Sequence, residues 1–489
     1  MRKKIIILFI PFCLLFTLCG EKPHDETALN RLPDIFPDYK NITIPVNIAP
    51  LNFKLTDSSE QIYVEIEGKN NLYKMDCNQN IAKIGANKWN KLLNSSVGDS
   101  LRITVHSKKS GKWNKYMPFY YSVSPQPIDK YLVYRLIMPG YQTWNEMGIY
   151  QRNLENFDQS EILTSKLLPG TCMNCHSFSH NNPDNMILHL REVNNGTILI
   201  QKGKMQFLKT KTDSTFGNAA FPYWHPSNRF IAFSIDKVVQ IFHSAGENRA
   251  EALDMKSDIV VYDIEKNEMI TSDLIFSPNS FEIYPSFSPD GKTMFFCSAE
   301  AKKLPDEFKK VKYSLCSISF DEQKRKFGNT VDTLISASSM NKSITFPRIS
   351  PDGKYLVFSM SEYGHSPAYR PDADLYIMDL STMQFHALDN LNSNNVESYH
   401  SWSSNSRWMV FSSRRVDGLY MTPFITYIDE KGNPTKPFLL PQESPDFYTR
   451  FLFSFNIPEF SVNKVSLNLN QVEKIIQKPA KQVNFRKTK

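Results

Sequence analysis

The chain has 489 residues, of which 41% are hydrophobic, 13% aromatic and 22% charged. These values are ordinary for a globular protein and exclude a disordered chain, a collagen-like fibre and a polytopic membrane protein. The net charge of +7 is concentrated at positions 2–4 and 471–489, so the body offers no basic face for nucleic acid. Because 29 prolines outnumber 18 glycines and 34 residues are phenylalanine, we expect short strands and turns in an all-β fold.

Residues 1–19 have the pattern of an export signal. A basic start precedes an apolar run, 5–18, which is too short to span a membrane comfortably. Cys19 follows this run and precedes a polar stretch, so it resembles the lipidated cysteine of a bacterial lipoprotein. Leu18 stands where a small residue is usual, and simple secretion or an uncleaved anchor are the alternatives. The resemblance implies an extracytoplasmic protein in the periplasm or cell envelope, held by a lipid anchor at the outer membrane.

The next two regions differ in pattern. Residues 20–40 are polar and contain Pro23, Pro33 and Pro37, which predicts a tether. Residues 41–128 contain short apolar bursts, such as QIYVEIEG and LRITVHS, separated by turn residues. This pattern predicts an immunoglobulin-like β-sandwich.

An internal repeat occupies much of residues 129–465. In each copy a short strand ends in a tight turn, and an apolar strand ending in Phe-Ser or a similar pair returns beside it. Clear copies are PYWHPSNRFIAFS from Pro222, PSFSPDGKTMFFCS from Pro285, PRISPDGKYLVFS from Pro347 and HSWSSNSRWMVFS from His400. A fainter copy begins at Pro183, and a last inner half is expected at Phe447–Phe455. The clear copies begin 53–63 residues apart, and repeats of this length predict a propeller.

Outer half-repeats follow the inner ones, and one outer half near residue 148 has no inner half before it. We therefore expect six blades closed into a circle, with C-terminal strands completing the first blade. The turns SPDGK at 288–292 and 350–354 resemble those of TolB-type propellers, a WD-repeat-like class. This resemblance implies a fold and no particular function. Residues 466–489 are predicted to be a solvated basic tail.

The chemical signal of the chain is Cys172-Met173-Asn174-Cys175-His176. This Cys-x-x-Cys-His arrangement resembles the attachment motif of c-type cytochromes. The resemblance implies one covalent haem c, with thioether bonds at Cys172 and Cys175 and His176 as the proximal iron ligand, on a loop at 170–178. A structural or redox disulfide between the two cysteines and a zinc site are the alternatives, although no second Cys-x-x-Cys is present.

Propeller topology predicts that the motif lies in the loop before an innermost strand, on the face that carries the longest insertions. On that face His243 is our first candidate for the distal iron ligand, and His189 is the second. Arg191 is expected to pair with a haem propionate or with a surface carboxylate. Five repeat aromatics are assigned to the core without a ligand role: Tyr223, Trp224, Phe287, Trp402 and Trp408.

These patterns together predict an exported c-type haem protein that acts in electron transfer or haem-dependent redox chemistry with an envelope partner. The alternative is a haem-free propeller that binds an envelope protein or a glycan, with Cys172–Cys175 as a structural disulfide. The sequence does not decide whether the protein is an enzyme.

Overall fold

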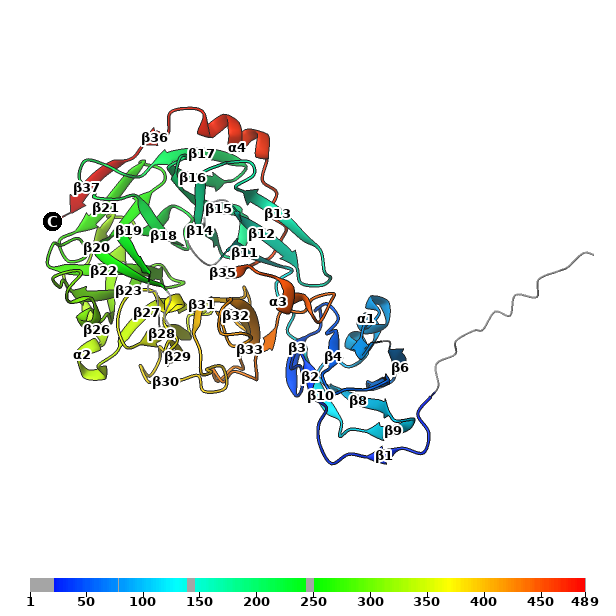
Figure 1. The fold of residues 1–489 in the computed structure, drawn as a ribbon. Coiled ribbons are helices and arrows are strands. Elements are labelled where there is room, and N and C mark those ends of the chain that lie inside the picture. Colours follow the sequence, from blue (N-terminus) through cyan, green and yellow to red (C-terminus); the bar gives the residue numbers. More distant parts are fainter. Residues whose placement is uncertain (1–21, 78, 139–145, 243–249, 489) are drawn as a thin grey trace, which may run out of the picture.

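The computed structural model describes residues 22–77, 79–138, 146–242 and 250–488. An N-terminal β-domain is followed by a propeller of radially arranged sheets (Figure 1). Within these ranges no helix is long and apolar enough to cross a membrane. The predicted all-β class is confirmed.

The N-terminal domain packs two sheets and a helix around one apolar core. The larger sheet contains β1 (Thr27–Ala28), β3 (Ile42–Pro45), β5 (Gln61–Glu67), β6 (Leu72–Cys77), β8 (Ser100–Lys109), β9 (Lys112–Lys115) and β10 (Phe119–Ser124). The smaller sheet contains β2 (Ile35–Phe36), β4 (Phe53–Leu55) and β7 (Ile81–Ala82). Helix α1 (Ala86–Ser95), which was not predicted, buries Trp89, Leu92 and Leu93. Strands β1 and β2 lie inside 20–40, so the tether prediction was wrong for that part of the segment.

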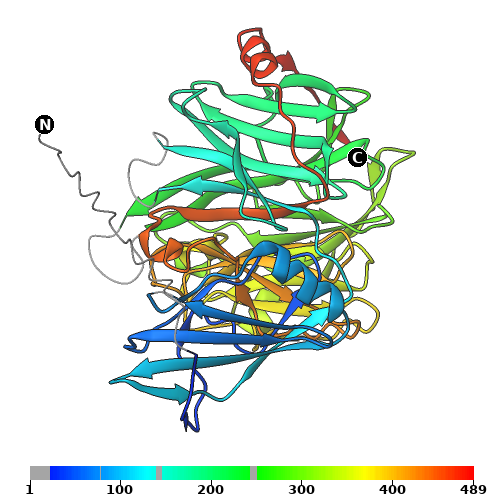
Figure 2. The same ribbon diagram turned by 90° about the vertical axis from the view of Figure 1, so that its right-hand side faces the viewer.

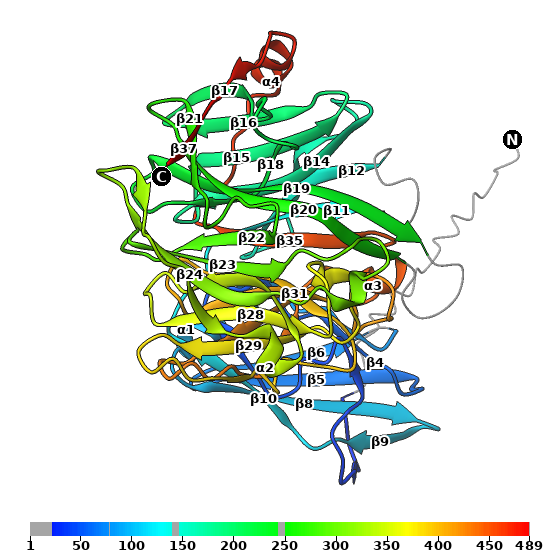
Figure 3. The same cartoon turned by 90° about the vertical axis from the view of Figure 1, so that its left-hand side faces the viewer.

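Six sheets of four or five strands make up the propeller in the described ranges. Their strands, sheet by sheet, are β35 (Ser454–Ser461), β11 (Tyr131–Ile137), β12 (Met147–Asn153) and β13 (Gln159–Thr164); β14 (Thr171–Ser179), β15 (Asn182–Glu192), β16 (Gly196–Gln201) and β17 (Lys204–Lys209); β18 (Ala219–Trp224), β19 (Phe230–Phe242), β20 (Ala250–Asp263) and β21 (Glu268–Ser272); β22 (Ser280–Phe287), β23 (Thr293–Glu300), β24 (Ser314–Asp321), β25 (Lys326–Phe327) and β26 (Asp332–Ile335); β27 (Ser343–Ile349), β28 (Tyr355–Ser361), β29 (Asp374–Asp379) and β30 (Phe385–Ala387); β31 (Glu397–Trp402), β32 (Trp408–Ser413), β33 (Thr422–Tyr427) and β34 (Phe438–Leu439). Figure 3 shows the long β19–β20 hairpin reaching past the neighbouring sheets.

The innermost strands form a closed ring. Strands β14, β18, β22, β27, β31 and β35 each contact the next, and β35 also contacts β14. Strand β35 pairs antiparallel with β11, so the two ends of the propeller share a sheet, as circular closure requires. The last inner half lies later than predicted, because Phe447–Arg450 forms helix α3 and the strand begins at Ser454.

Every innermost strand carries a bulge at the same repeat position. There the pairing register shifts and one residue adopts a positive φ. These residues are Cys175, Phe221, Tyr284, Phe346, Tyr399 and Ile457. Four of them are aromatic, and neighbouring rings lie 4.2–5.1 Å apart between centroids. Cys175 therefore takes, in its own sheet, the place that a larger apolar side chain takes in the other five.

The C-terminal segment is ordered against the rim of the propeller. After helix α4 (Leu469–Ile476), β36 (Lys481–Gln482) pairs parallel with β17, and β37 (Asn484–Thr488) pairs parallel with β21. Figure 2 shows this red segment along the outer edge of the green sheets. Residues 466–488 are mostly exposed, as the prediction of a solvated tail requires, but they are not a loose end, because β36 and β37 pair with the edges of two sheets.

Candidate functional site

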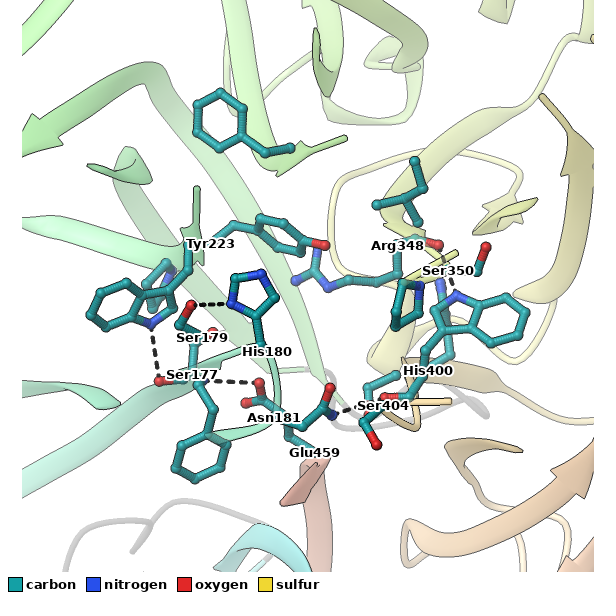
Figure 4. Close-up of a pocket in the computed structure, with 18 of the residues that line it drawn as sticks. Ser177, Ser179, His180, Asn181, Tyr223, Arg348, Ser350, His400, Ser404 and Glu459 are labelled. Atoms are coloured by element: carbon teal, nitrogen blue, oxygen red, sulfur yellow. Dashed lines mark hydrogen bonds between the residues drawn. The ribbon is translucent and has the colours of Figure 1, made fainter. Parts of the chain in front are cut away.

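A cavity of about 220 Å³ lies at the centre of the ring, among the innermost strands and the turns that follow them. Its wall includes the residues two positions after the bulge in five sheets: Ser177, Tyr223, Arg348, Ser401 and Glu459. Figure 4 shows several of these side chains pointing toward one another from separate strands. The repeat thus places a polar side chain from each of five sheets around one central space.

Arg348 extends from β27 along the aromatic wall. Its guanidinium carbon lies 5.4 Å from the ring centroid of Tyr223 and 4.9 Å from that of Phe346. Nη1 donates to the carbonyl of Pro347 at 2.8 Å. Burial lowers the pKa of Arg348, but guanidinium groups stay charged in proteins. The cavity therefore contains a fixed positive charge.

Glu459, on β35, supplies the cavity's carboxyl group. Oε1 accepts a hydrogen bond from the backbone nitrogen of Phe178 at 3.0 Å. Burial raises the pKa of Glu459 to about 8, against which Arg348 acts in the lowering direction. At neutral pH this carboxyl is mainly protonated, because desolvation disfavours the charged form.

His176 directs one ring nitrogen toward the cavity. The ring is hydrogen-bonded to the backbone of Val133, while Nε2 has no hydrogen-bond partner in the described part of the chain. Oε2 of Glu459 lies 3.9 Å from Nε2. Burial and the nearby Arg135 lower the pKa of His176 to about 3, so its imidazole is neutral. A neutral imidazole with a free nitrogen is the form that binds iron.

Cys172 and Cys175 lie on strand β14, so the prediction that the motif forms a loop at 170–178 was wrong. The bulge that makes this segment an innermost strand occurs at Cys175 itself. Both thiols are buried and free, and burial raises the pKa of each. The structure therefore contains no Cys172–Cys175 disulfide. Neither cysteine lines the cavity, and His176 is the member of the motif that does.

The other predicted ligands lie elsewhere. His189 is buried on β15, where its Nδ1 lies 3.0 Å from the hydroxyl of Thr197, and it does not line the cavity. His243 lies outside the described residues. Arg191 pairs with Asp236 at 3.6 Å, and since the Asp236 side chain is only 3% exposed, this is not the surface carboxylate that the sequence offered as one alternative. Cys19 also lies outside the described ranges.

The prediction that the repeat aromatics belong to the core is confirmed for Trp224, Phe287, Trp402 and Trp408, which are buried in core clusters, while Tyr223 is partly buried against such a cluster. All of them except Trp408 also line the cavity, which was not predicted. The missed signal is visible once the repeats are aligned from the bulge: FPYW, YPSF, FPRI and YHSW, with CHSF from Cys175 in the same register. In that alignment His176 corresponds to His400, whose Nε2 lies 2.9 Å from the carbonyl of Val357.

The donor set at β14 fits a covalent haem in its chemistry. It combines two free thiols with a neutral imidazole, and a backbone hydrogen bond of the kind made to Val133 orients iron-bound histidines. Because the thiols lie in the strand layer behind the cavity wall, attachment requires the side chains around them to repack. A zinc site has no such support, since the described residues contain no group of three or more His, Cys, Asp or Glu placed to hold a metal.

Comparisons with known proteins give no family for the chain. No family model matches, and no curated protein matches. Solved structures similar to it include an oligogalacturonate lyase from Vibrio parahaemolyticus, at 12% identity and a TM-score of 0.35, covering 60% of this chain and 70% of that one. A prolyl endopeptidase (12% identity, TM-score 0.34) matches 63% of this chain and 42% of its own length. For the tricorn protease (12%, TM-score 0.33) these shares are 70% and 34%. The chain thus spans less than half of the last two proteins.

Proposed function

We propose that this chain is an exported, lipid-anchored protein in which a six-bladed, TolB-like propeller carries one haem c. In this proposal Cys172 and Cys175 form the thioether bonds, His176 is the proximal iron ligand, and the protein acts in electron transfer or haem-dependent redox chemistry at the bacterial envelope. The observation that supports it is the presence on one strand of two free thiols and a neutral imidazole whose Nε2 has no partner among the described residues.

The haem would supply one-electron redox chemistry at its iron, and the chain's own residues would tune it. The backbone of Val133 would hold the His176 ring in one orientation. The aromatic layer of Phe221, Tyr284, Phe346 and Tyr399 would restrict water on the channel side of Cys175. Arg135, whose Nη1 donates to the carbonyl of Met173 at 3.4 Å, would keep positive charge beside the motif.

The direct test is a pyridine haemochrome spectrum of protein purified from an exporting host that attaches haem. We expect a c-type spectrum from the wild-type chain and its loss in Cys172→Ala/Cys175→Ala. Cys297→Ala is the matched control, because Cys297 is another buried free thiol outside the motif. A colourless wild-type protein, made in cells that load a control cytochrome, would overturn the proposal.

A second candidate function is a haem-free propeller that binds an envelope protein or a glycan. Its support is that Cys175 and His176 occupy positions that the repeat fills structurally in every other sheet, with His400 as the counterpart of His176. The central cavity, walled by tryptophan and tyrosine rings, would then be the main functional feature. The same haemochrome experiment separates the two functions.

A further inference from the structure

The central cavity contains a cation without an anionic partner. Arg348 is the one lysine or arginine among the described residues that line it. In the described ranges no carboxylate oxygen lies within 4.0 Å of its guanidinium. Nη1 donates to the carbonyl of Pro347. The Nε and Nη2 donors have no acceptor among the described residues. Arg348 is partly exposed to the cavity, so these donors are available to an anionic group that enters it.

Neighbouring residues fix the position of the Arg348 guanidinium. It lies over the rings of Tyr223 and Phe346, from two different sheets. The backbone carbonyl of Arg348 accepts a hydrogen bond from Nε1 of Trp402 at 3.1 Å, which fixes the start of the side chain. Figure 4 shows the side chain crossing the cavity toward Tyr223. Such fixing reduces the entropy that a ligand must overcome to bind.

Several other polar groups in the wall already have partners inside the protein, although Nε2 of His176 has none among the described residues. Oε1 of Glu459 accepts from Phe178, and Nε2 of His400 lies against the carbonyl of Val357. Nδ2 of Asn181 donates to the carbonyls of Trp402 and Phe460, each at 3.1 Å. The wall also contains aromatic rings, among them Trp224, Phe287 and Tyr399, together with prolines and serines. The space therefore combines one free cationic anchor with apolar surfaces.

We propose that the central cavity binds a carboxylate joined to an apolar body, with Arg348 as its anchor. The planar guanidinium can donate two parallel hydrogen bonds to a carboxylate, and the aromatic walls can cover the apolar body. This inference goes beyond the proposed function, because it assigns a ligand to Arg348 and holds whether or not a haem is attached near His176, which also lines the cavity. The carboxylate belongs either to a free organic acid or to a haem propionate, and the experiment below distinguishes these sources.

The first test uses the haem-free wild-type chain and a matched pair of probes, 4-phenylbutyrate and 4-phenylbutyramide. Binding is followed by calorimetry and by tryptophan fluorescence, since Trp224 and Trp402 line the cavity. We expect the acid to bind about 10- to 100-fold more tightly than the neutral amide, as for other hydrogen bonds to charged groups. Equal affinities, or no binding of the acid at millimolar concentration, would overturn the proposal.

The second test identifies the anchor. Arg348→Gln should weaken binding of the acid by about 10- to 100-fold and leave binding of the amide almost unchanged. Arg450→Gln is the control, because the Arg450 side chain is 80% exposed and outside the cavity. An Arg348→Gln chain that folds, by its circular dichroism spectrum, and still prefers the acid would overturn the assignment. If the variant does not fold, the comparison of acid and amide on the wild-type chain still decides.

The third arm repeats the acid titration on haem-loaded protein. Retained binding there would assign Arg348 to a free acid. Loss of binding would show that the haem excludes the acid from the cavity, as a propionate on Arg348 requires. If no haem is ever attached, the first two tests stand unchanged, so failure of the haem proposal is distinguishable from failure of this one.

Discussion

His176 and His400 occupy the same position of the repeat, one residue after the bulge, and both are buried. Burial lowers the pKa of each to about 3, so both rings are neutral. They differ in the nitrogen that has no hydrogen-bond partner in the described ranges, which is Nε2 in His176 and Nδ1 in His400. Only His176 follows two cysteines at the haem-attachment spacing. His400 is therefore a matched control for the role of His176 as an iron ligand.

The pair yields a prediction at the scale of one side chain. His176→Ala should keep the covalent haem, because the thioether bonds do not use the imidazole, but should change the absorption spectrum of the protein as isolated. His400→Ala should leave that spectrum unchanged. The measurement is absorption spectroscopy on purified variants with equal haem content. An unchanged spectrum in His176→Ala would exclude this residue as the iron ligand.

At this scale the sequence revealed the chemistry of the site but not its place. Cys172, Cys175 and His176 were recognisable from spacing alone. Their position on a strand could not be predicted, because the repeats were aligned at their turns. The bulge lies before the turn, and no glycine marks it in the sequence. The same omission hid Arg348, which is an ordinary strand residue until the register places it in the channel.

At the scale of elements, two inner hairpins end in the same Asp-Gly turn. Gly291 and Gly353 have φ values of +73° and +74°, in the left-handed region that favours glycine. A Cβ at Gly291 would lie 2.3 Å from Nε2 of His225, whereas a Cβ at Gly353 would meet nothing closer than 3.6 Å. His225 cannot move aside freely, because its Nε2 lies 3.0 Å from the carbonyl of Gly291.

The two turns give a matched prediction for stability. Gly353→Ala should lower the free energy of unfolding by about 1–2 kcal/mol, the cost of a left-handed conformation with a Cβ. Gly291→Ala should cost more, by a further ~1–3 kcal/mol, since it also displaces a buried hydrogen bond. Urea denaturation of both variants measures the difference. Equal losses in the free energy of unfolding would show that the His225 side chain moves aside without a cost in stability.

The elements differ in how well they can be predicted from their own sequence. Turns with Asp-Gly or Asn between apolar strands predicted the inner hairpins, because that chemistry is local. Helix α1 was missed, since its buried Trp89, Leu92 and Leu93 are too few to stand out among neighbouring strands. The ordered tail was missed because β36 and β37 are fixed by pairing with distant strands, β17 and β21.

At the scale of the molecule, the N-terminal domain and the propeller share one apolar core. Residues of both, such as Trp89 and Phe411, belong to the same buried cluster. Polar contacts tie the boundary: Nε1 of Trp408 donates to the carbonyl of Gln126 at 3.0 Å, and the backbone nitrogen of Ser404 donates to Asp129 at 2.7 Å. We therefore expect the two parts to move and unfold together.

Buried carboxyl groups of the propeller predict how its stability depends on pH. Burial raises the pKa of Glu282 and of Glu459 to about 8 and that of Asp258 to about 7. The folded protein then keeps protons that the unfolded chain releases above a pH of ~4.5, so stability falls as the pH rises toward 8. Between pH 6.5 and 8 each glutamate should contribute a loss of about 1–2 kcal/mol.

Thermal denaturation at several pH values checks this prediction. The wild-type Tm should fall from pH 6.5 to pH 8.5, and Glu282→Gln should fall less, because the amide cannot lose a proton. Glu300→Gln is the control, since the Glu300 side chain is 77% exposed. A Tm that rises over this range, or identical slopes in all three proteins, would contradict it.

The central claim is that Cys172 and Cys175 hold a haem, and the intact mass of the mature protein tests it most directly. Protein purified from an exporting host that attaches haem should have the mass of its mature chain plus one haem, and Cys172→Ala/Cys175→Ala should lack that increment. A wild-type mass without haem, from cells that load a control cytochrome, would contradict the claim.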